Sequence, residues 1–191
     1  MQGRIVVITG SPGTGKTTIS NIIAQESDME KSVHMHTDDF YHYLSKGAIQ
    51  PHLPDSDRQN LIVIEAFLEA AKRYARGGYD VIVDGIIGPW FLRPWLNIIQ
   101  EGYELHYIIL RASKDKTLNR AITRLKLDRK MNTELVESMW EQFNNIGIYE
   151  QNVIDTTNFS IEETALMVKK KIKNKSMILS WNDDVKNKLN F

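Results

Sequence analysis

Short apolar runs alternate along the chain with longer segments in which apolar residues recur at helical spacing. The apolar runs are bounded by turn residues, and they predict strands at residues 4–9, 33–37, 79–85, 104–110 and 152–157. The amphipathic segments predict helices at residues 16–26, 61–76, 93–100, 133–146 and 160–173, and a helix followed by a loop at 113–130. The first run is apolar on both faces, as in the central strand of a parallel sheet. The pattern therefore predicts an α/β fold.

A glycine-rich stretch joins the first strand to the first helix and has the form G-x-x-x-x-G-K-[ST]. Its glycines permit positive φ, so backbone N–H groups can turn inward and form an anion site with the positive end of the helix. Lys16 adds a charge that can reach the β- and γ-phosphates, and the Thr17 hydroxyl is placed to bind Mg²⁺. We assign nucleotide binding to the whole stretch: Gly10, Ser11, Pro12, Gly13, Thr14, Gly15, Lys16, Thr17 and Thr18.

Acidic residues follow the second and third predicted strands. Ligands of parallel α/β sheets lie beyond the carboxyl ends of the strands, so we expect Asp38, Asp39 and Asp84 near the glycine-rich stretch. Apolar residues run into Asp84 as they do in a Walker B motif, and we predict that this carboxylate holds Mg²⁺ directly or through water. The alternative role for Asp84 is a cap for the following turn.

Two further segments are candidates to cover ligands. Residues 40–60 are rich in turn residues and predict a short helix and loop over an acceptor pocket, with a surface excursion as the alternative. We expect Arg58 in this segment either to bind a carboxylate or phosphate of the acceptor or to form a surface ion pair. Residues 112–132 carry Arg120, Arg124 and Arg129 near helical spacing, which indicates a solvated basic face or a lid that neutralises the transferred phosphoryl group. We assign Arg120 and Arg124 to nucleotide binding and Arg124 also to catalysis.

The remaining aromatic, apolar and histidine residues indicate a role in a functional site less clearly. The aromatic loop at residues 86–91 is a candidate wall of the acceptor site, with Trp90 in the core as the alternative. A stripe of Leu, Met, Trp and Phe at 135–143 predicts core packing. His36, His42 and His52 do not form a convincing set of metal ligands, and we assign no role to them.

Composition narrows the class of protein. Lys plus Arg and Asp plus Glu both number 24, so net charge makes no case for nucleic acid or a membrane as partner. The chain has no cysteine, which excludes disulfides and thiol chemistry and fits the cytoplasm. We expect no signal peptide, because a strand begins almost at once, and no membrane span.

With the glycine-rich stretch, the acids and the arginines in place, the chain resembles a small P-loop kinase of the group that holds gluconate kinase, shikimate kinase and chloramphenicol phosphotransferase. The resemblance covers about residues 3–173. It implies a P-loop NTPase three-layer sandwich, with a five-stranded parallel sheet of order 2-3-1-4-5 between helices. We therefore expect a kinase-like domain at 1–175, with acceptor and lid segments at about 40–60 and 112–132. A C-terminal tail at 176–191 would either pack on the domain or contact a partner.

The resemblance also implies chemistry. In that group an Asp after the second strand often acts as general base on the acceptor hydroxyl, which here is Asp38, with Asp39 as the alternate. The expected reaction moves the γ-phosphoryl group of ATP, with Mg²⁺ as cofactor, to a hydroxyl of a small molecule that no motif identifies. A nucleotide or nucleoside kinase and an ATP-hydrolysing switch without an acceptor are the alternatives.

Overall fold

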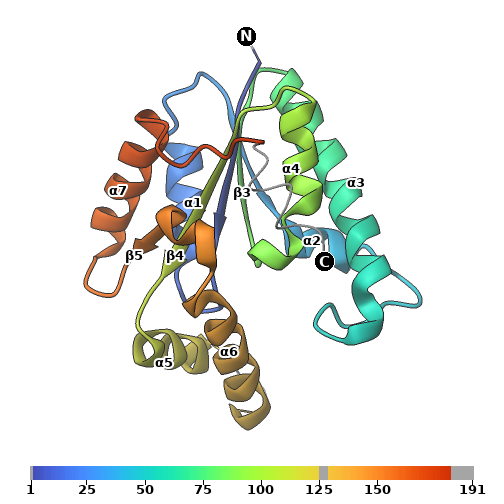
Figure 1. Cartoon of the computed structure of the whole chain (residues 1–191), viewed down its shortest axis with the longest axis vertical. Coiled ribbons are helices and arrows are strands. Elements are labelled where there is room, and N and C mark those ends of the chain that lie inside the picture. Colours follow the sequence, from blue (N-terminus) through green and yellow to red (C-terminus); the bar gives the residue numbers. More distant parts are fainter. Residues whose placement is uncertain (1, 125–128, 182–191) are drawn as a thin grey trace.

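A computed structural model describes residues 2–124 and 129–181, without the side chains of residues 122, 124 and 129–132. Its strands form one parallel sheet of order β2-β3-β1-β4-β5 (Figure 1). The strands are β1 (Ile5–Thr9), β2 (Ser32–His36), β3 (Asp80–Gly85), β4 (Leu105–Arg111) and β5 (Val153–Asp155). The predicted strand order is confirmed, and its fully buried central strand β1 explains the apolar run at the start of the sequence.

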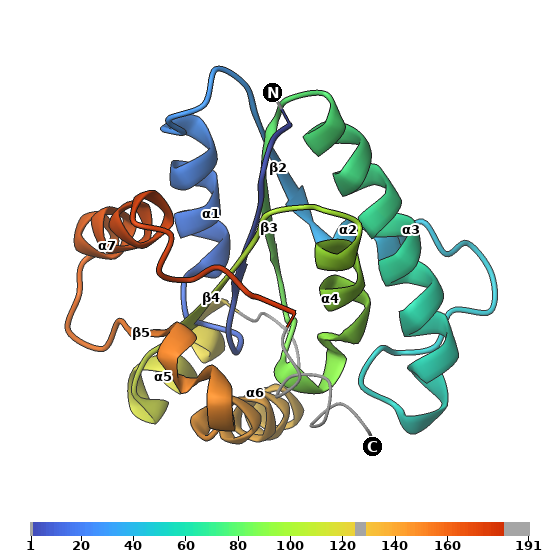
Figure 2. The ribbon, with the colours of Figure 1, turned by 45° about the horizontal axis from the view of Figure 1, so that its top comes forward.

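Helices cover both faces of this sheet (Figure 2). The helices are α1 (Lys16–Gln25), α2 (Thr37–His42), α3 (Asp57–Arg76), α4 (Arg93–Gln100), α5 (Lys114–Arg124), α6 (Arg129–Asn144) and α7 (Ile161–Lys173). Three short 3₁₀ turns lie at Pro54–Ser56, Pro89–Phe91 and Gly147–Asn152. Within the described ranges no helix is both long enough and apolar enough to cross a bilayer.

The alternation of β1 side chains divides the core into two clusters. Val6 and Ile8 pack with residues of α1 and α7, whereas Ile5 and Val7 pack with residues of α3 and α4. Successive side chains of a strand point to opposite faces, so a strand that is apolar on both faces must be covered on both. The three-layer arrangement thus follows from the pattern of the central strand.

The polypeptide after β2 departs from the sequence prediction. Asp38 and Asp39 follow the end of β2, as expected, but they already lie in the first turn of α2, because the strand ends at His36 and the helix begins at Thr37. This helix can begin directly over the end of β3 because Gly85 has no side chain: an added Cβ would lie 2.0 Å from Thr37 Oγ1. The helix predicted at 61–76 begins earlier, at Asp57, and the predicted fifth strand is shorter.

The described part of the C-terminal segment packs on the sheet. The Tyr107 amide donates to the Met177 carbonyl and the Leu179 amide donates to the Leu105 carbonyl, each at 2.9 Å. Met177 is buried in the cluster with α1 and α7, and Leu179 is buried in the cluster with α3 and α4. These residues cover the part of β4 that the short strand β5 does not reach.

Candidate active site

The glycine-rich stretch forms a tight loop between β1 and α1. Gly10, Gly13 and Gly15 have φ of 146°, 85° and 88°, values that favour glycine strongly over other residues. The loop is closed by the Thr14 hydroxyl, which donates to the Ser11 carbonyl at 2.9 Å. No described side chain caps the start of α1, so its first amides face the loop as donors for an anion.

Close packing holds this loop in place from two sides. A Cβ on Gly10 would lie 2.2 Å from the Leu110 carbonyl oxygen, and one on Gly13 would lie 2.6 Å from the Thr117 carbonyl oxygen. The first contact joins the loop to β4 and the second joins it to α5. The glycines therefore serve close backbone approach as well as positive φ.

The carboxylate of Asp84 divides its contacts between two sets of partners. Thr17 Oγ1 donates to Asp84 Oδ2 at 2.5 Å. On the other oxygen, His36 Nδ1 lies 2.6 Å and His34 Nε2 lies 3.0 Å from Oδ1. His36 pairs with Asp84 in the β2–β3 register, and His34 lies on the same face two residues earlier.

Burial alone raises the pKa of the Asp84 carboxyl, but this effect is outweighed. Hydrogen bonds with His34 and Thr17 and the charge of the nearby His36 lower the pKa below its usual value. Asp84 is 2% exposed and is thus an ionised group kept out of solvent at neutral pH.

Two sets of donors around Asp84 could hold a metal ion. Thr17 and Asp84 offer hydroxyl and carboxylate oxygens, the hard ligands that suit Mg²⁺. His34, His36 and Asp84 also offer one atom each within 4.8 Å of one another, a mixed set of the kind that zinc accepts. The sequence prediction grouped His36 with His42 and His52, and it missed His34 because this grouping depends on strand register.

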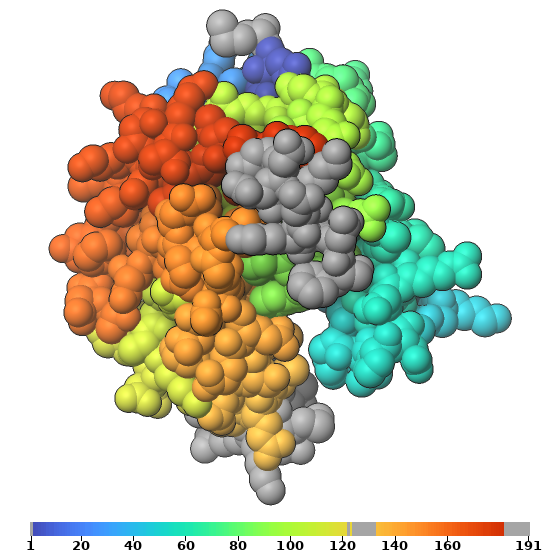
Figure 3. Space-filling view, viewed as in Figure 1, coloured from blue at the N-terminus to red at the C-terminus, as the bar shows by residue number. Residues whose placement is uncertain are grey.

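A large cavity opens beside α2. It has a volume of about 1310 Å³ and includes Asp38 and Tyr41 in its wall. Burial, and then the charge of Asp38, raise the pKa of Tyr41 to about 12, so this phenol keeps its proton at neutral pH. In Figure 3 the surface is hollowed between α6 and the segment at 44–57. Several residues of the segment at 40–60 thus line one side of a cavity.

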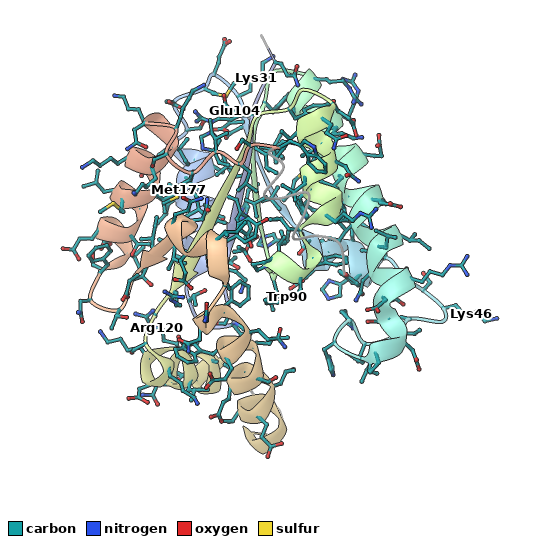
Figure 4. All side chains as sticks on the ribbon, in the orientation of Figure 1. Lys31, Lys46, Trp90, Glu104, Arg120 and Met177 are labelled. Atoms are coloured by element: carbon teal, nitrogen blue, oxygen red, sulfur yellow. The ribbon has the colours of Figure 1, made fainter. Side chains whose placement is uncertain are left out.

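The opposite wall comes from the aromatic loop and from α6. Trp90, 54% exposed, lines the cavity and packs edge-on against Phe143 at 5.1 Å between ring centroids (Figure 4). Leu135 and Met139 of α6 line the cavity too. The expectation that this stripe is core packing holds for Phe143, which is 1% exposed, and is wrong for Leu135 and Met139. The stripe gave no signal that separates a core face from a cavity wall.

A second, smaller cavity of about 250 Å³ lies beside the glycine-rich loop. Its wall combines loop residues, Arg120 of α5 and the turn between β5 and α7, including Thr156 and Phe159 (Figure 4). Arg120 reaches this position because α5 packs its Thr117 carbonyl against Gly13. The sequence prediction assigned Arg120 to nucleotide binding but gave no ligand role to the turn at 156–161.

The remaining predicted residues fall outside these walls. Asp39 and Arg58 are exposed and do not line the large cavity. Arg58 follows Asp57, which does line it, and adjacent helical side chains point in different directions. The side chains of Arg124 and Arg129 lie outside the described residues.

Solved structures share this fold. A Mycobacterium tuberculosis APS kinase in complex with AMPPNP and APS is similar with a TM-score of 0.67 at 16% identity, over 90% of this chain and 98% of that chain. A sugar kinase from Janibacter sp. HTCC2649 has a TM-score of 0.65 at 17% identity, over 90% and 95%. The Deinococcus radiodurans tunicamycin resistance protein has a TM-score of 0.63 at 19% identity, over 90% and 96%. At such identities the likeness shows the fold.

Sequence comparison places the chain in a family. No curated protein matches the sequence. A family model for an AAA domain matches residues 6–144, which include the glycine-rich loop, Asp38 and Asp84. The fold is the one shared by the small P-loop kinases, and the resemblance inferred from the sequence is confirmed. The chain therefore belongs to this AAA-domain family of P-loop proteins.

Proposed function

We propose that the protein is an ATP-dependent phosphotransferase that moves the γ-phosphoryl group of ATP to a hydroxyl of a small molecule. One observation carries the proposal: the phosphate loop with its Thr17–Asp84 contact and a cavity with Asp38 in its wall occur in one P-loop fold. A nucleotide switch needs the loop but has no use for an acceptor cavity beside α2. The fold that the protein shares with kinases supports the same proposal.

In this proposal the loop holds the phosphates. The loop amides and Lys16 bind the β- and γ-phosphates, and Thr17 with Asp84 would hold Mg²⁺. When bound, the ion supplies positive charge that neutralises phosphate oxygens. The lowered pKa of Asp84 keeps its carboxylate ionised and ready for this role at neutral pH.

Asp38 is the proposed general base. It takes the proton of the acceptor hydroxyl while the hydroxyl oxygen forms a bond to the γ-phosphorus. The bond from that phosphorus to the β–γ bridging oxygen breaks, and ADP leaves with the electron pair. Tyr41 keeps its proton and can donate a hydrogen bond to the acceptor. Asp38 is preferred to Asp39 because only Asp38 of this pair lines the cavity.

The small cavity is the proposed place of the nucleoside end of ATP. Arg120 presents a planar guanidinium beside Thr156 and the exposed ring of Phe159. Planar cationic and aromatic groups stack well on a nucleobase. Arg120 is therefore assigned to nucleotide binding away from the acceptor.

A nucleoside kinase is the second candidate. The observation in its favour is the set of aromatic rings in the wall of the large cavity, those of Tyr41, Trp90 and Phe91. A base held between such rings would place a ribose hydroxyl beside Asp38. This candidate differs from the first in the acceptor and not in the chemistry.

The test is transfer of labelled phosphate from ATP across a panel of sugars, sugar acids, nucleosides and aromatic alcohols, with Lys16→Ala as the blank. The proposal predicts a labelled phosphomonoester that forms only with Lys16 present. Labelled free phosphate alone, from every acceptor and from a small-molecule extract of cells, would contradict the proposal and favour the switch.

A further inference from the structure

We infer that the large cavity takes an uncharged or cationic amphipathic alcohol and rejects acceptors that carry a carboxylate, sulfate or phosphate. The inference rests on the proposed function, because it names the class of molecule that the proposed phosphotransferase would modify.

The wall is mainly apolar, and several of its side chains are unusually exposed for their type. Ile49, Leu53 and Trp90 are 36%, 43% and 54% exposed and all line the cavity. Ile64, which is buried, and Met139, which is half-buried, add further apolar surface to the wall. Exposed apolar side chains gathered around one cavity mark a surface that gains free energy when a ligand removes it from water.

The groups of the wall that carry a charge at alkaline pH have one sign. Among the described residues that line the cavity, the carboxylates are Asp38 and Asp57, the basic side chains are the imidazoles of His42 and His52, and there is no lysine or arginine. Proteins that bind carboxylate, sulfate or phosphate groups usually supply a guanidinium or an ammonium to offset the loss of hydration. Arg58, which directly follows the lining residue Asp57 in the sequence, does not line the wall. An anionic acceptor would therefore lose hydration and meet repulsion from two carboxylates.

The neutral polar groups of the wall fit hydroxyl recognition. Gln50, Ser138 and Gln142 line the cavity and can each donate and accept hydrogen bonds, and Asn60 adds an Oδ1 acceptor because its Nδ2 already donates to two protein oxygens. A volume of about 1310 Å³ exceeds the range of roughly 300 to 1,000 Å³ that is usual for sites of drug-sized ligands. The expected acceptor is thus a large molecule with an apolar body and at least one hydroxyl.

The test uses two fluorescent probes with the same aromatic body. N-phenylnaphthylamine is uncharged, and anilinonaphthalene sulfonate is its sulfonated counterpart. Binding is measured at about pH 8, well above the ordinary histidine pKa of about 6.5. Mg²⁺ and a non-hydrolysable ATP analogue fill the nucleotide site. We expect the uncharged probe to bind at least about tenfold more tightly, because the sulfonate would be buried without a counter-charge.

Three variants locate the effect in the cavity. Leu53→Lys places a cation in the wall and is expected to bring the two affinities close to each other. Leu53→Gln, which changes polarity without charge, should keep the preference. Leu166→Lys adds the same charge at an exposed leucine of α7 outside the wall, and it should also keep the preference.

The outcomes separate this inference from the proposed function. Equal or tighter binding of the sulfonate by the unmodified protein, an unchanged ratio in Leu53→Lys, or no binding of either probe would overturn the inference. None of these results requires phosphoryl transfer. If transfer to a carboxylated or phosphorylated acceptor is found, the phosphotransferase stands and the acceptor class is wrong. If the probe preference holds and no acceptor is phosphorylated, the cavity stands and the phosphotransferase fails.

Discussion

Asp84 links the phosphate loop to the second strand through a single carboxylate. One oxygen accepts from Thr17, and the other lies against His34 and His36. This arrangement fixes the direction of the oxygen that faces the loop, because each side of the carboxylate is held by its own partners. A side chain at the end of β3 is thereby oriented by contacts from both α1 and β2.

The first prediction concerns this carboxylate. Asp84→Asn removes the negative charge but keeps the shape, so we expect nucleotide affinity in the presence of Mg²⁺ to fall by about tenfold or more. Affinity measured by calorimetry in EDTA should change much less, since no metal is then involved. Asp155→Asn, at the end of β5, is the matched control. Equal losses with and without Mg²⁺ would show that Asp84 does not act through the ion.

At the scale of elements, the start of α2 depends on its contact with the end of β3. Thr37 packs where a side chain of residue 85 would otherwise be, and Asp38 follows in the same helical turn. A small change at Gly85 should therefore move the proposed base without touching it.

The second prediction is that Gly85→Ala destabilises the protein by about 1–3 kcal/mol through overpacking against Thr37. Urea unfolding measures this change in the free energy of unfolding. Thr37→Ala in the same background removes the Oγ1 atom that lies 2.0 Å from the added Cβ, so it should recover part of the loss. An additive loss in the double variant would mean that the two residues do not compete for space.

The elements that sequence reasoning predicted well are those with local causes. The buried pattern of β1, the glycines of the loop and the acid near the end of β3 are each recognisable from a few neighbouring residues. The contact between His34 and Asp84 depends on the register of two strands, and the position of Met139 depends on how α6 crosses the cavity. Contacts between distant segments leave no local pattern, so the sequence indicated the loop better than the large cavity.

At the scale of the whole molecule, the C-terminal segment closes the edge of β4 over a buried histidine. His106 is 0% exposed, pairs with Ile178 in an antiparallel bridge and lies 2.9 Å from Glu104 through Nε2. Burial lowers the pKa of His106, and the Glu104 carboxylate, which acts in the opposite direction, does not restore it. The folded protein therefore favours the neutral imidazole.

The third prediction follows from the sign of that shift. The unfolded chain takes up a proton at about pH 6.5, the ordinary value for histidine, whereas the folded chain does so only at a lower pH. The free energy of unfolding should therefore fall as the pH drops below about 6.5 and level off for this group below the folded pKa. His106→Gln should show a shallower fall in urea unfolding across this range, while the exposed His52→Gln should behave like the unmodified protein. If the free energy of unfolding fell equally steeply with pH in all three proteins, the lowered pKa of His106 in the folded protein would be contradicted.

The proposed activity of the whole molecule is a phosphoryl transfer assisted by Asp38. The decisive measurement is the rate at which labelled phosphomonoester forms from MgATP and the acceptor found by the panel, in the unmodified protein, Asp38→Asn and Asp39→Asn. We predict a loss of about 10²–10⁴-fold for Asp38→Asn with nucleotide affinity unchanged, and little effect of Asp39→Asn. A large loss in Asp39→Asn with an active Asp38→Asn variant would contradict the assignment of the base and of the cavity in which it lies.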